Sequence, residues 1–433
     1  MSESVGKNQG AESLSRRGFL RSTAAAGAAA LVSSRVSPSL AASESEVLRV
    51  GLIGCGGRGT GAAKNAMEAA PNVHVVAMGD AFQDHLEKSR ANLAKDEDVG
   101  HLFKVDDAHC FVGFDAYEKV INSGVDMVIL ATPPHFRPIH FKAAVDAGKH
   151  VFTEKPVATD APGVRCFIET AALAEQKKLC VVAGTQRRHQ HHYLEAIRRI
   201  HDGAIGKVVS IHAYWNGGTL WSFPRQDGWS DMEYQMRNWY YYTWLCGDHI
   251  VEQHVHNLDV ANWVMGQTPV KAVGLGGRQV RTEPVFGHIY DHFSIIYDYA
   301  DGTRMTSLCR QMKNCKNDVS ETIYGTKGVC HMDGGKAKIS GKFSLEWGDG
   351  PNPYVVEHTD LINSIRSGWP INEGKQVAES TLTAIMGRMA AYSGQEITWE
   401  QALGSEEKLG PSEYTWGDLP FPEPAIPGKT PLA

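Results

Sequence analysis

The residues whose types and spacing most clearly point to chemistry form a glycine loop, "GCGGRG", at positions 54–59. Gly54 permits a tight turn, Gly56 lets the backbone approach a pyrophosphate, and Gly59 allows a helix to pack closely on a strand. A helix that begins at such a loop presents unpaired N–H groups and a partial positive charge to phosphates. The spacing therefore predicts a loop that binds a dinucleotide.

An acidic residue follows where a dinucleotide site needs one. Asp80 ends the apolar pattern at 73–80, which is the next strand expected after the loop. A carboxylate in this position accepts hydrogen bonds from the ribose hydroxyls and repels a 2′-phosphate. We therefore expect NAD as the cofactor, with NADP disfavoured.

Histidine and cysteine could support metal chemistry, because the chain has 19 histidines and eight cysteines. One histidine group, "DHIVEQHVH" at 248–256, contains no HExxH pattern, and its His254 and His256 alternate as residues of a strand would. The cysteines form no CxxC pair. We expect no metal site, and we expect the cysteines to be buried free thiols.

Alternating strand and helix patterns surround the glycine loop. Apolar runs predict strands at 47–54, 73–80, 126–132, 150–153 and 179–183, and helical patterns lie at 60–70, 140–147 and 157–178. Successive βα units of this kind imply a doubly wound parallel Rossmann sheet, with its ligand at the carboxyl ends of the strands. The loops at 54–59, 132–135 and 154–156 follow three of these strands, so they should converge on one crevice.

The second half of the chain has a different pattern. Long strands are expected at 207–215, 270–280, 291–299 and 303–311, followed by helices at 354–366 and 376–393. Short turns between the strands indicate hairpins. We predict an α/β protein with a Rossmann domain over 43–184 and a C-terminal α/β domain over 185–433. This second domain should hold a large, mostly antiparallel open sheet and end in a proline-rich tail.

Four sequence elements together resemble one known family. They are "GLIGCGGRG", "ATPPHF", "EKP" at 154–156 and "HNLDVANWVMG" at 256–266. These elements resemble the Gfo/Idh/MocA family, which includes glucose–fructose oxidoreductase and inositol 2-dehydrogenase. The resemblance implies a Rossmann domain followed by an α/β domain whose open sheet flanks the active site and often mediates oligomer contacts. A homo-oligomer is the state that it implies.

The resemblance also implies which residues are catalytic. The lysine of the family's EKP element matches Lys155, and the family's catalytic histidine matches His256. Glu252 stands where the family commonly has Asp, and His254 where it commonly has Gly. An imidazole can take the proton of a hydroxyl near neutral pH, and Lys155 can hydrogen-bond the reacting oxygen. Glu252 would orient His256 or tune its pKa.

Binding residues follow from the same loops and from an aromatic segment at 229–244. The residues expected to bind the cofactor are Gly54, Gly56, Gly57, Arg58, Gly59, Asp80, Thr132, Pro133, His135, Glu154, Lys155 and Gln186. The residues expected to bind the substrate are Arg187, Trp239, Tyr242 and His256. Core packing or a subunit interface would explain most of the other aromatic residues equally well.

Two activities are compatible with these residues. One is an oxidoreductase that moves a hydride between a tightly bound nicotinamide cofactor and a hydroxyl of a sugar, polyol or glycoside. The other resembles glycoside hydrolase family 109, which uses NAD for hydrolysis without net oxidation. The sequence leaves both open, whereas the complete set of motifs argues against a sugar-binding protein without catalysis.

The N-terminal segment predicts export. "SRRGFLRSTAAAGAAALVSS" at 15–34 carries a twin-arginine pattern and an apolar stretch, and small residues follow at 39–42. We expect a signal peptide over 1–42 and a periplasmic or other extracytoplasmic location. Because no soluble nicotinamide pool exists there, NAD should be loaded before export and held tightly.

Charge and hydropathy narrow the partners. A net charge of −6 argues against nucleic acid and against electrostatic attachment to a membrane surface. No stretch after the signal segment is long enough for a membrane helix, so we expect no membrane insertion once that segment is removed. The expected partner is a small carbohydrate.

Overall fold

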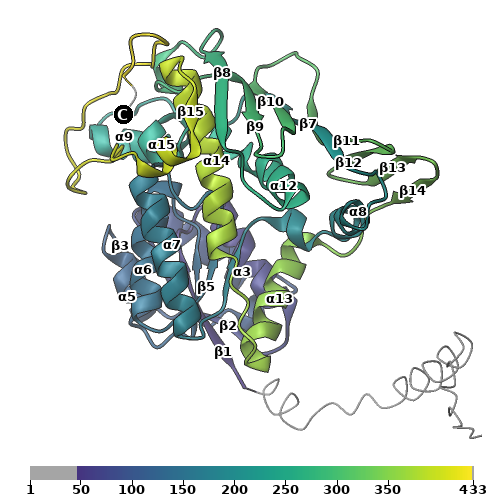
Figure 1. The fold of residues 1–433 in the computed structure, drawn as a ribbon. Coiled ribbons are helices and arrows are strands. Elements are labelled where there is room, and N and C mark those ends of the chain that lie inside the picture. Colours follow the sequence, from purple (N-terminus) through teal and green to yellow (C-terminus); the bar gives the residue numbers. More distant parts are fainter. Residues whose placement is uncertain (1–45, 432–433) are drawn as a thin grey trace, which may run out of the picture. The chain divides into compact units, whose positions relative to one another are not determined.

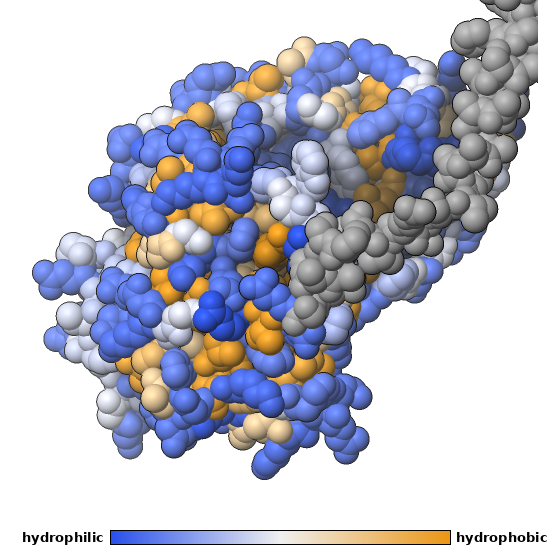
Figure 2. All heavy atoms as spheres, turned by 90° about the horizontal axis from the view of Figure 1, so that it is seen from below, coloured by the Kyte–Doolittle hydropathy of each residue, from blue (hydrophilic) through white to orange (hydrophobic). Residues whose placement is uncertain are grey.

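The computed structural model describes residues 46–431, so the predicted signal peptide lies outside the described residues. Two sheets organise the described chain, one of six strands and one of nine. Figure 1 shows the smaller sheet and its helices at the bottom and the larger sheet at the top. In the view from below, hydrophilic side chains surround scattered apolar ones, as on a face exposed to water (Figure 2).

The first sheet is the predicted Rossmann sheet. Its strands run in the order β3-β2-β1-β4-β5-β6, and every printed pairing among them is parallel. The strands are β1 Leu48–Ile53, β2 Val73–Asp80, β3 Cys110–Val112, β4 Met127–Leu130, β5 His150–Thr153 and β6 Val181–Ala183. The helices are α3 Gly57–Ala69, α4 Gln83–Ala94, α5 Ala116–Ile121, α6 Arg137–Asp146 and α7 Ala161–Gln176. Helices cover both faces, which is why β4 is an uninterrupted buried apolar run.

The second sheet is mostly antiparallel, as predicted, with one parallel pair between β7 and β10. Its strands are β7 Val208–Gly217, β8 Lys271–Gly277, β9 His292–Asp298, β10 Arg304–Gln311, β11 Asp318–Gly325, β12 Gly328–Asp333, β13 Ala337–Gly341, β14 Ser344–Trp347 and β15 Ile397–Thr398. Burial alternates along β9: Phe293, Ile295 and Tyr297 are buried, while Ser294 and Ile296 are exposed. One face therefore packs against helices and the other faces outward.

The remaining α-helices all follow β6 in the chain. They are α8 His191–His201, α9 Asp231–Arg237, α10 Thr243–Cys246, α11 His249–Glu252, α12 Val255–Met265, α13 Pro353–Ser367, α14 Gly374–Ser393 and α15 Trp399–Gly404. Although α13 follows β14 of the second sheet in sequence, it packs against α3 of the Rossmann domain, and α14 packs against α7. Leu361 and Ile362 of α13 belong to the Rossmann core.

Three features of the sequence analysis bear on chemistry here. The expectation that His254 and His256 alternate along a strand is wrong, because α12 begins at Val255 and includes His256. Two alternating histidines are too short a pattern to indicate a strand, and almost all residues of α12 are buried, so the sequence shows no clear helical periodicity there.

The cysteines are free thiols, and five of them are buried. Within 46–431, no helix is long and apolar enough to cross a membrane, and no three metal-ligating side chains cluster.

Candidate active site

The glycine loop lies between β1 and α3 in a conformation that other residues could not adopt. Gly54 has a φ of +98°, and a Cβ there would lie 2.6 Å from the backbone of Ala131. A Cβ on Gly59 would lie only 1.9 Å from the carbonyl oxygen of Gly54. In contrast, a Cβ on Gly56 or Gly57 would meet open space. The first pair is needed for the turn and for helix packing, whereas the second pair leaves the backbone open to a ligand.

The N-terminus of α3 is suited to an anion. Gly56 is the N-cap, no side chain caps the helix, and no acidic residue lies in its first turn. The first N–H groups of a helix have no partner within it, and the helix dipole adds a partial positive charge at this end. The site therefore fits the pyrophosphate of a dinucleotide.

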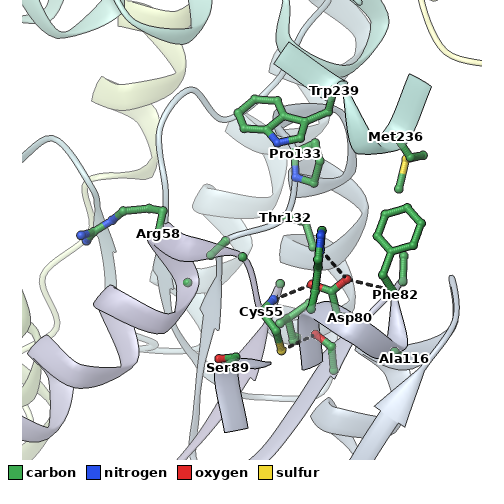
Figure 3. Close-up of a pocket in the computed structure, with 18 of the residues that line it drawn as sticks. Cys55, Arg58, Asp80, Phe82, Ser89, Ala116, Thr132, Pro133, Met236 and Trp239 are labelled. Carbon is green, nitrogen blue, oxygen red and sulfur yellow. Dashed lines mark hydrogen bonds and ion pairs between the residues drawn. The ribbon is translucent and has the colours of Figure 1, made fainter. Parts of the chain in front are cut away.

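A cavity of about 600 Å³ opens over this loop, within the size range of small-ligand sites. Its lining includes Gly54, Gly56, Gly57, Arg58, Gly59, Asp80, Phe82, Phe114, Thr132, Pro133, Trp221, Met236, Arg237 and Trp239. Figure 3 shows Asp80 beneath Thr132, with Trp239 and Met236 above from the second half of the chain. Both halves of the chain therefore enclose the cavity.

Asp80 is held at the edge of this cavity by two backbone N–H groups. Its Oδ2 accepts a hydrogen bond from Cys55 N at 2.6 Å, and its Oδ1 accepts one from Phe82 N at 2.9 Å. Each carboxylate oxygen has a further lone pair for a ribose hydroxyl. The fixed negative charge would repel a 2′-phosphate. The arrangement fits NAD.

Arg58, expected to bind the cofactor, is part of the cavity lining, but its guanidinium is engaged by other side chains of the protein. Its guanidinium points away from the loop (Figure 3) and donates to Glu154 and, at 3.4 Å, to Glu357 of α13. The Arg58 guanidinium also lies 4.8 Å from the centre of the Tyr354 ring. Burial and the nearby Glu154 hold the pKa of Glu357 well above its usual value. Arg58 therefore links the EKP element to α13, because the fold brings a distant carboxylate beside it.

Lys155 leaves the carboxyl end of β5 and meets Glu252 at the end of α11. Its Nζ donates to the backbone oxygen of Glu252 and, at 3.0 Å, to Glu252 Oε1. Both side chains are about one-tenth exposed, at 11% and 10%. The Glu252 carboxylate thus bonds Lys155, whereas the sequence analysis expected it to act on His256. Glu252 is placed to hold the ammonium group.

His256 is a buried histidine on α12. Its ring stacks on Trp215 of β7, with 5.6 Å between ring centres, and its Nδ1 is buried without a hydrogen-bond partner. Burial lowers the pKa of His256 well below 6.5, and the charges of Lys155 and Arg187 lower it further. Burial and these charges favour the neutral form of the imidazole, whose lone pair is the group a base uses.

The residues after β6 are engaged within the protein. Arg187 forms a buried ion pair with Glu321 at 2.6 Å, and its guanidinium lies 5.7 Å from the centre of the Trp215 ring. Gln186 Nε2 donates to Tyr354 Oη at 3.3 Å. Arg187 therefore supports the aromatic ring against which His256 packs. Trp215 itself was missed by the sequence analysis, although it ends a predicted strand.

Of the aromatic residues expected at the substrate, only one lies at the cavity. Trp239 is part of the lining, whereas Tyr242 packs against His288 and Phe421, with ring centres 5.9 and 6.2 Å away. The structure likewise does not bring His135 to the cavity. Its Nε2 lies 2.8 Å from Tyr414 Oη, and burial lowers its pKa to about 4. Short helical turns point successive side chains in different directions, so proximity in sequence misplaced these two residues.

Comparison with known families agrees with this geometry. Residues 48–198 match the oxidoreductase family with an NAD-binding Rossmann fold, and residues 193–331 match the GFO/IDH/MocA C-terminal domain. The chain belongs to the Gfo/Idh/MocA family of oxidoreductases. NAD is therefore the cofactor that the glycine loop, the open end of α3 and Asp80 would hold.

Named relatives within the Gfo/Idh/MocA family are dehydrogenases. Inositol 2-dehydrogenase of Pseudomonas fluorescens (strain SBW25) is 25% identical over 331 residues, which cover 74% of this chain and 87% of that protein. The scyllo-inositol 2-dehydrogenase (NAD(+)) of Bacillus subtilis (strain 168) is 26% identical over 288 residues, covering 65% and 72%.

Solved Gfo/Idh/MocA structures share the fold. Aldose-aldose oxidoreductase from Caulobacter crescentus, complexed with glycerol, has a TM-score of 0.64 at 20% identity and covers 82% of this chain and 100% of its own. Levoglucosan dehydrogenase, in complex with NADH and levoglucosan, has a TM-score of 0.65 at 16% identity, with 82% and 99% coverage.

Proposed function

We propose that the chain oxidises a secondary hydroxyl of an uncharged sugar or polyol with NAD. The observation that carries this proposal is the Lys155–Glu252 ion pair beside the carboxyl end of β5, together with a buried His256 close enough for the Lys155 charge to lower its pKa. The carboxyl ends of the Rossmann strands also carry the glycine loop and Asp80. An acid–base site and a dinucleotide site thus share one edge of the sheet, as alcohol oxidation requires.

Each side chain has a separate task in this reaction. When bound, NAD accepts the hydride that leaves the carbon of the alcohol. His256 takes the hydroxyl proton, since its imidazole is neutral. Lys155 donates a hydrogen bond to the reacting oxygen and stabilises its developing negative charge. Glu252 holds the Lys155 ammonium in place. The alcohol has then lost one hydride and one proton and become a ketone.

Charge balance around His256 favours an uncharged substrate. The three cations whose charges lower the pKa of His256 include Lys155 and Arg187, and the third is Arg58. Each is already paired with a carboxylate: Lys155 with Glu252, Arg187 with Glu321, and Arg58 with Glu154. A sugar acid or sugar phosphate would have to compete with these pairs. The relatives named for inositol and levoglucosan also act on neutral molecules.

The named relatives favour net oxidation over the hydrolytic alternative. The four proteins described above are dehydrogenases or an oxidoreductase. The contacts of Lys155 and His256 are compatible with net oxidation. Both reactions begin with oxidation of a hydroxyl to a ketone, and hydrolysis then needs loss of a proton from the neighbouring carbon, so the fate of the ketone decides between them.

Export and self-association complete the proposal. The twin-arginine pattern at 15–34 supports export of a folded chain that already carries NAD.

The outer face of the large sheet carries three exposed apolar side chains on the neighbouring strands β8 and β9: Val273, Leu275 and Ile296. An exposed apolar group of this kind supports a homo-oligomer that uses this face.

Two substitutions test the assignment of the acid–base residues. Lys155→Ala and His256→Ala should each lower polyol or sugar oxidation by at least about a hundredfold, the usual scale for losing such a partner. Both variants should still bind NAD, because neither side chain lines the cavity over the glycine loop. Lys142→Ala is the control, since Lys142 is 57% exposed on α6. Turnover near the wild-type rate in either variant would remove that residue from the mechanism.

A further inference from the structure

The C-terminal segment, residues 405–431, has no task in the proposed reaction. It follows α15 and contains neither helix nor strand. Figure 1 shows it in yellow, running beside α9 and α15. A segment of this length without helix or strand is uncommon in a compact domain, so its contacts matter.

The segment is first anchored on the Rossmann domain. Leu409 N donates to Asp160 Oδ2 at 3.1 Å, at the start of α7. Tyr414 Oη and His135 Nε2 lie 2.8 Å apart. His135 follows Thr132 and Pro133, which line the cofactor cavity. The segment thus holds the loop that forms one wall of the cavity.

Trp416 then packs behind the adjacent wall. Its ring centre lies 4.6 Å from that of Phe114 and 5.3 Å from that of Phe82. Both phenylalanines line the cavity, and Phe82 accompanies Asp80 at the end of β2. Trp416 itself is not part of the cavity lining, so it supports these rings without lining the ligand space.

The segment continues to α9, in the other half of the chain. Met232 N donates to the Gly417 carbonyl oxygen at 3.1 Å, and Gln235 Nε2 donates to that of Pro420, also at 3.1 Å. The last residues of the same helix, Met236 and Arg237, line the cavity. The C-terminal segment therefore contacts α9, whose last residues line one side of the cavity, and it also contacts the residues that form the opposite walls.

Arg237 shows how α9 meets the opposite wall. Its two terminal nitrogens pair with the Asp84 carboxylate at 3.0 and 3.2 Å, and its guanidinium lies 4.2 Å from the centre of the Phe82 ring. A ligand that leaves past this edge must separate α9 from Phe82. The C-terminal segment ties both sides of that edge together.

We propose that residues 405–431 form a strap that holds the cofactor cavity closed and sets how slowly NAD leaves it. This inference rests on the proposed function, in which NAD is a resident cofactor. The strap contributes no group to the reaction, so loosening it should change release of the nucleotide more than the chemical step. Affinity differences of this kind reside mainly in the dissociation rate.

Release of NADH from the loaded, full-length protein tests the strap. Protein saturated with NADH is mixed with a large excess of NAD, and the loss of bound NADH fluorescence is followed over time. Trp416→Ala removes the packing on Phe82 and Phe114, and Tyr414→Phe removes the hydrogen bond to His135. We expect the first to speed NADH release by at least about tenfold and the second by a smaller factor. Trp369→Ala is the control, since Trp369 is 82% exposed and lies outside the cavity lining.

The outcomes separate the strap from the proposed function. Faster release from the strap variants, with release from the control at the wild-type rate, supports the strap. Release at the wild-type rate from both Trp416→Ala and Tyr414→Phe overturns it, even if sugar oxidation is established. If Trp416→Ala does not fold, Tyr414→Phe alone decides in the same way. A wild-type protein that binds neither NAD nor NADH overturns the proposed function and the strap with it.

Discussion

At His256, burial and neighbouring charges both lower the pKa of the imidazole. Removing the ring from water disfavours its charged form, and the cations Lys155 and Arg187 disfavour it again. An ordinary histidine would be partly protonated at neutral pH. Both effects therefore favour the unprotonated form of His256, which is the form that a base needs.

This shift predicts the pH dependence of oxidation. His256 acts as a base only when it is unprotonated, and its pKa lies below 6.5. As pH falls from about 8 to about 5, the value of kcat/KM should therefore not decline around pH 6.5, where an unperturbed histidine gains its proton. The decline should come at lower pH. A profile for polyol oxidation that halves near pH 6.5 or above would contradict the role of His256.

Asp80 predicts the choice of cofactor at the same scale. Asp80→Ser removes a negative charge that faces the ribose, so it should weaken NAD binding and narrow the preference over NADP. Dissociation constants for both nucleotides measure this change. Asp98→Ser is the matched control, because Asp98 is 79% exposed. Equal affinity of the wild-type protein for NAD and NADP would remove the role assigned to Asp80.

Sequence reasoning located site residues where a motif fixes backbone geometry. Asp80 and the glycines lie at the cavity because a strand, a turn and a helix set their positions. Arg58 and Glu252 lie near their expected places but have other partners. Those partners, Glu357 and Lys155, come from segments far away in the chain. No local pattern could predict such pairs, since they depend on how distant elements pack.

At the scale of elements, the start of α3 carries the most restrictive requirement. The helix must approach β1 so closely that only glycine fits at 59, whereas position 61 has room for a methyl group. Replacing glycine with alanine should therefore lower the stability of the protein at position 59 and raise it at position 61.

Gly59→Ala should destabilise the protein by about 1–3 kcal/mol, because the added methyl group collides with the backbone of Gly54. Gly61→Ala should stabilise it by up to about 1 kcal/mol, because alanine favours a helix interior. Urea unfolding of the protein without nucleotide measures both changes. A Gly59→Ala variant as stable as the wild type would show that α3 does not need this close approach.

Helices and strands could be predicted from the sequence where the pattern of buried residues along them is regular. The strands of the Rossmann sheet read as apolar runs because both of their faces are covered. The region between 81 and 125 gave no such signal, since α4 is a polar helix with few buried residues. The segment from 231 to 252 folds into short helices, so its aromatic residues show no single periodicity.

At the scale of the whole molecule, the chain returns to its first domain after β14 and then adds β15 to the second sheet. The helices α13 and α14 pack on α3 and α7, and the C-terminal segment reaches the loop that contains His135. Sequence analysis predicted both helices but not where they pack, because a helical pattern identifies an apolar face and not its partner. These returning segments connect the cofactor cavity to the rest of the protein.

In the proposed function, this protein oxidises a neutral sugar or polyol with NAD that it carries. The most direct measurement mixes the purified protein with inositol, levoglucosan and other uncharged sugars and polyols, without added cofactor. Reduced nicotinamide is then followed by its near-ultraviolet absorbance. The account predicts a rise of about one equivalent per chain with at least one substrate, and no rise in Lys155→Ala protein that carries the same nucleotide. Cleavage of a glycoside at unchanged absorbance, with no reduction by any sugar or polyol even when NAD is added, would contradict it.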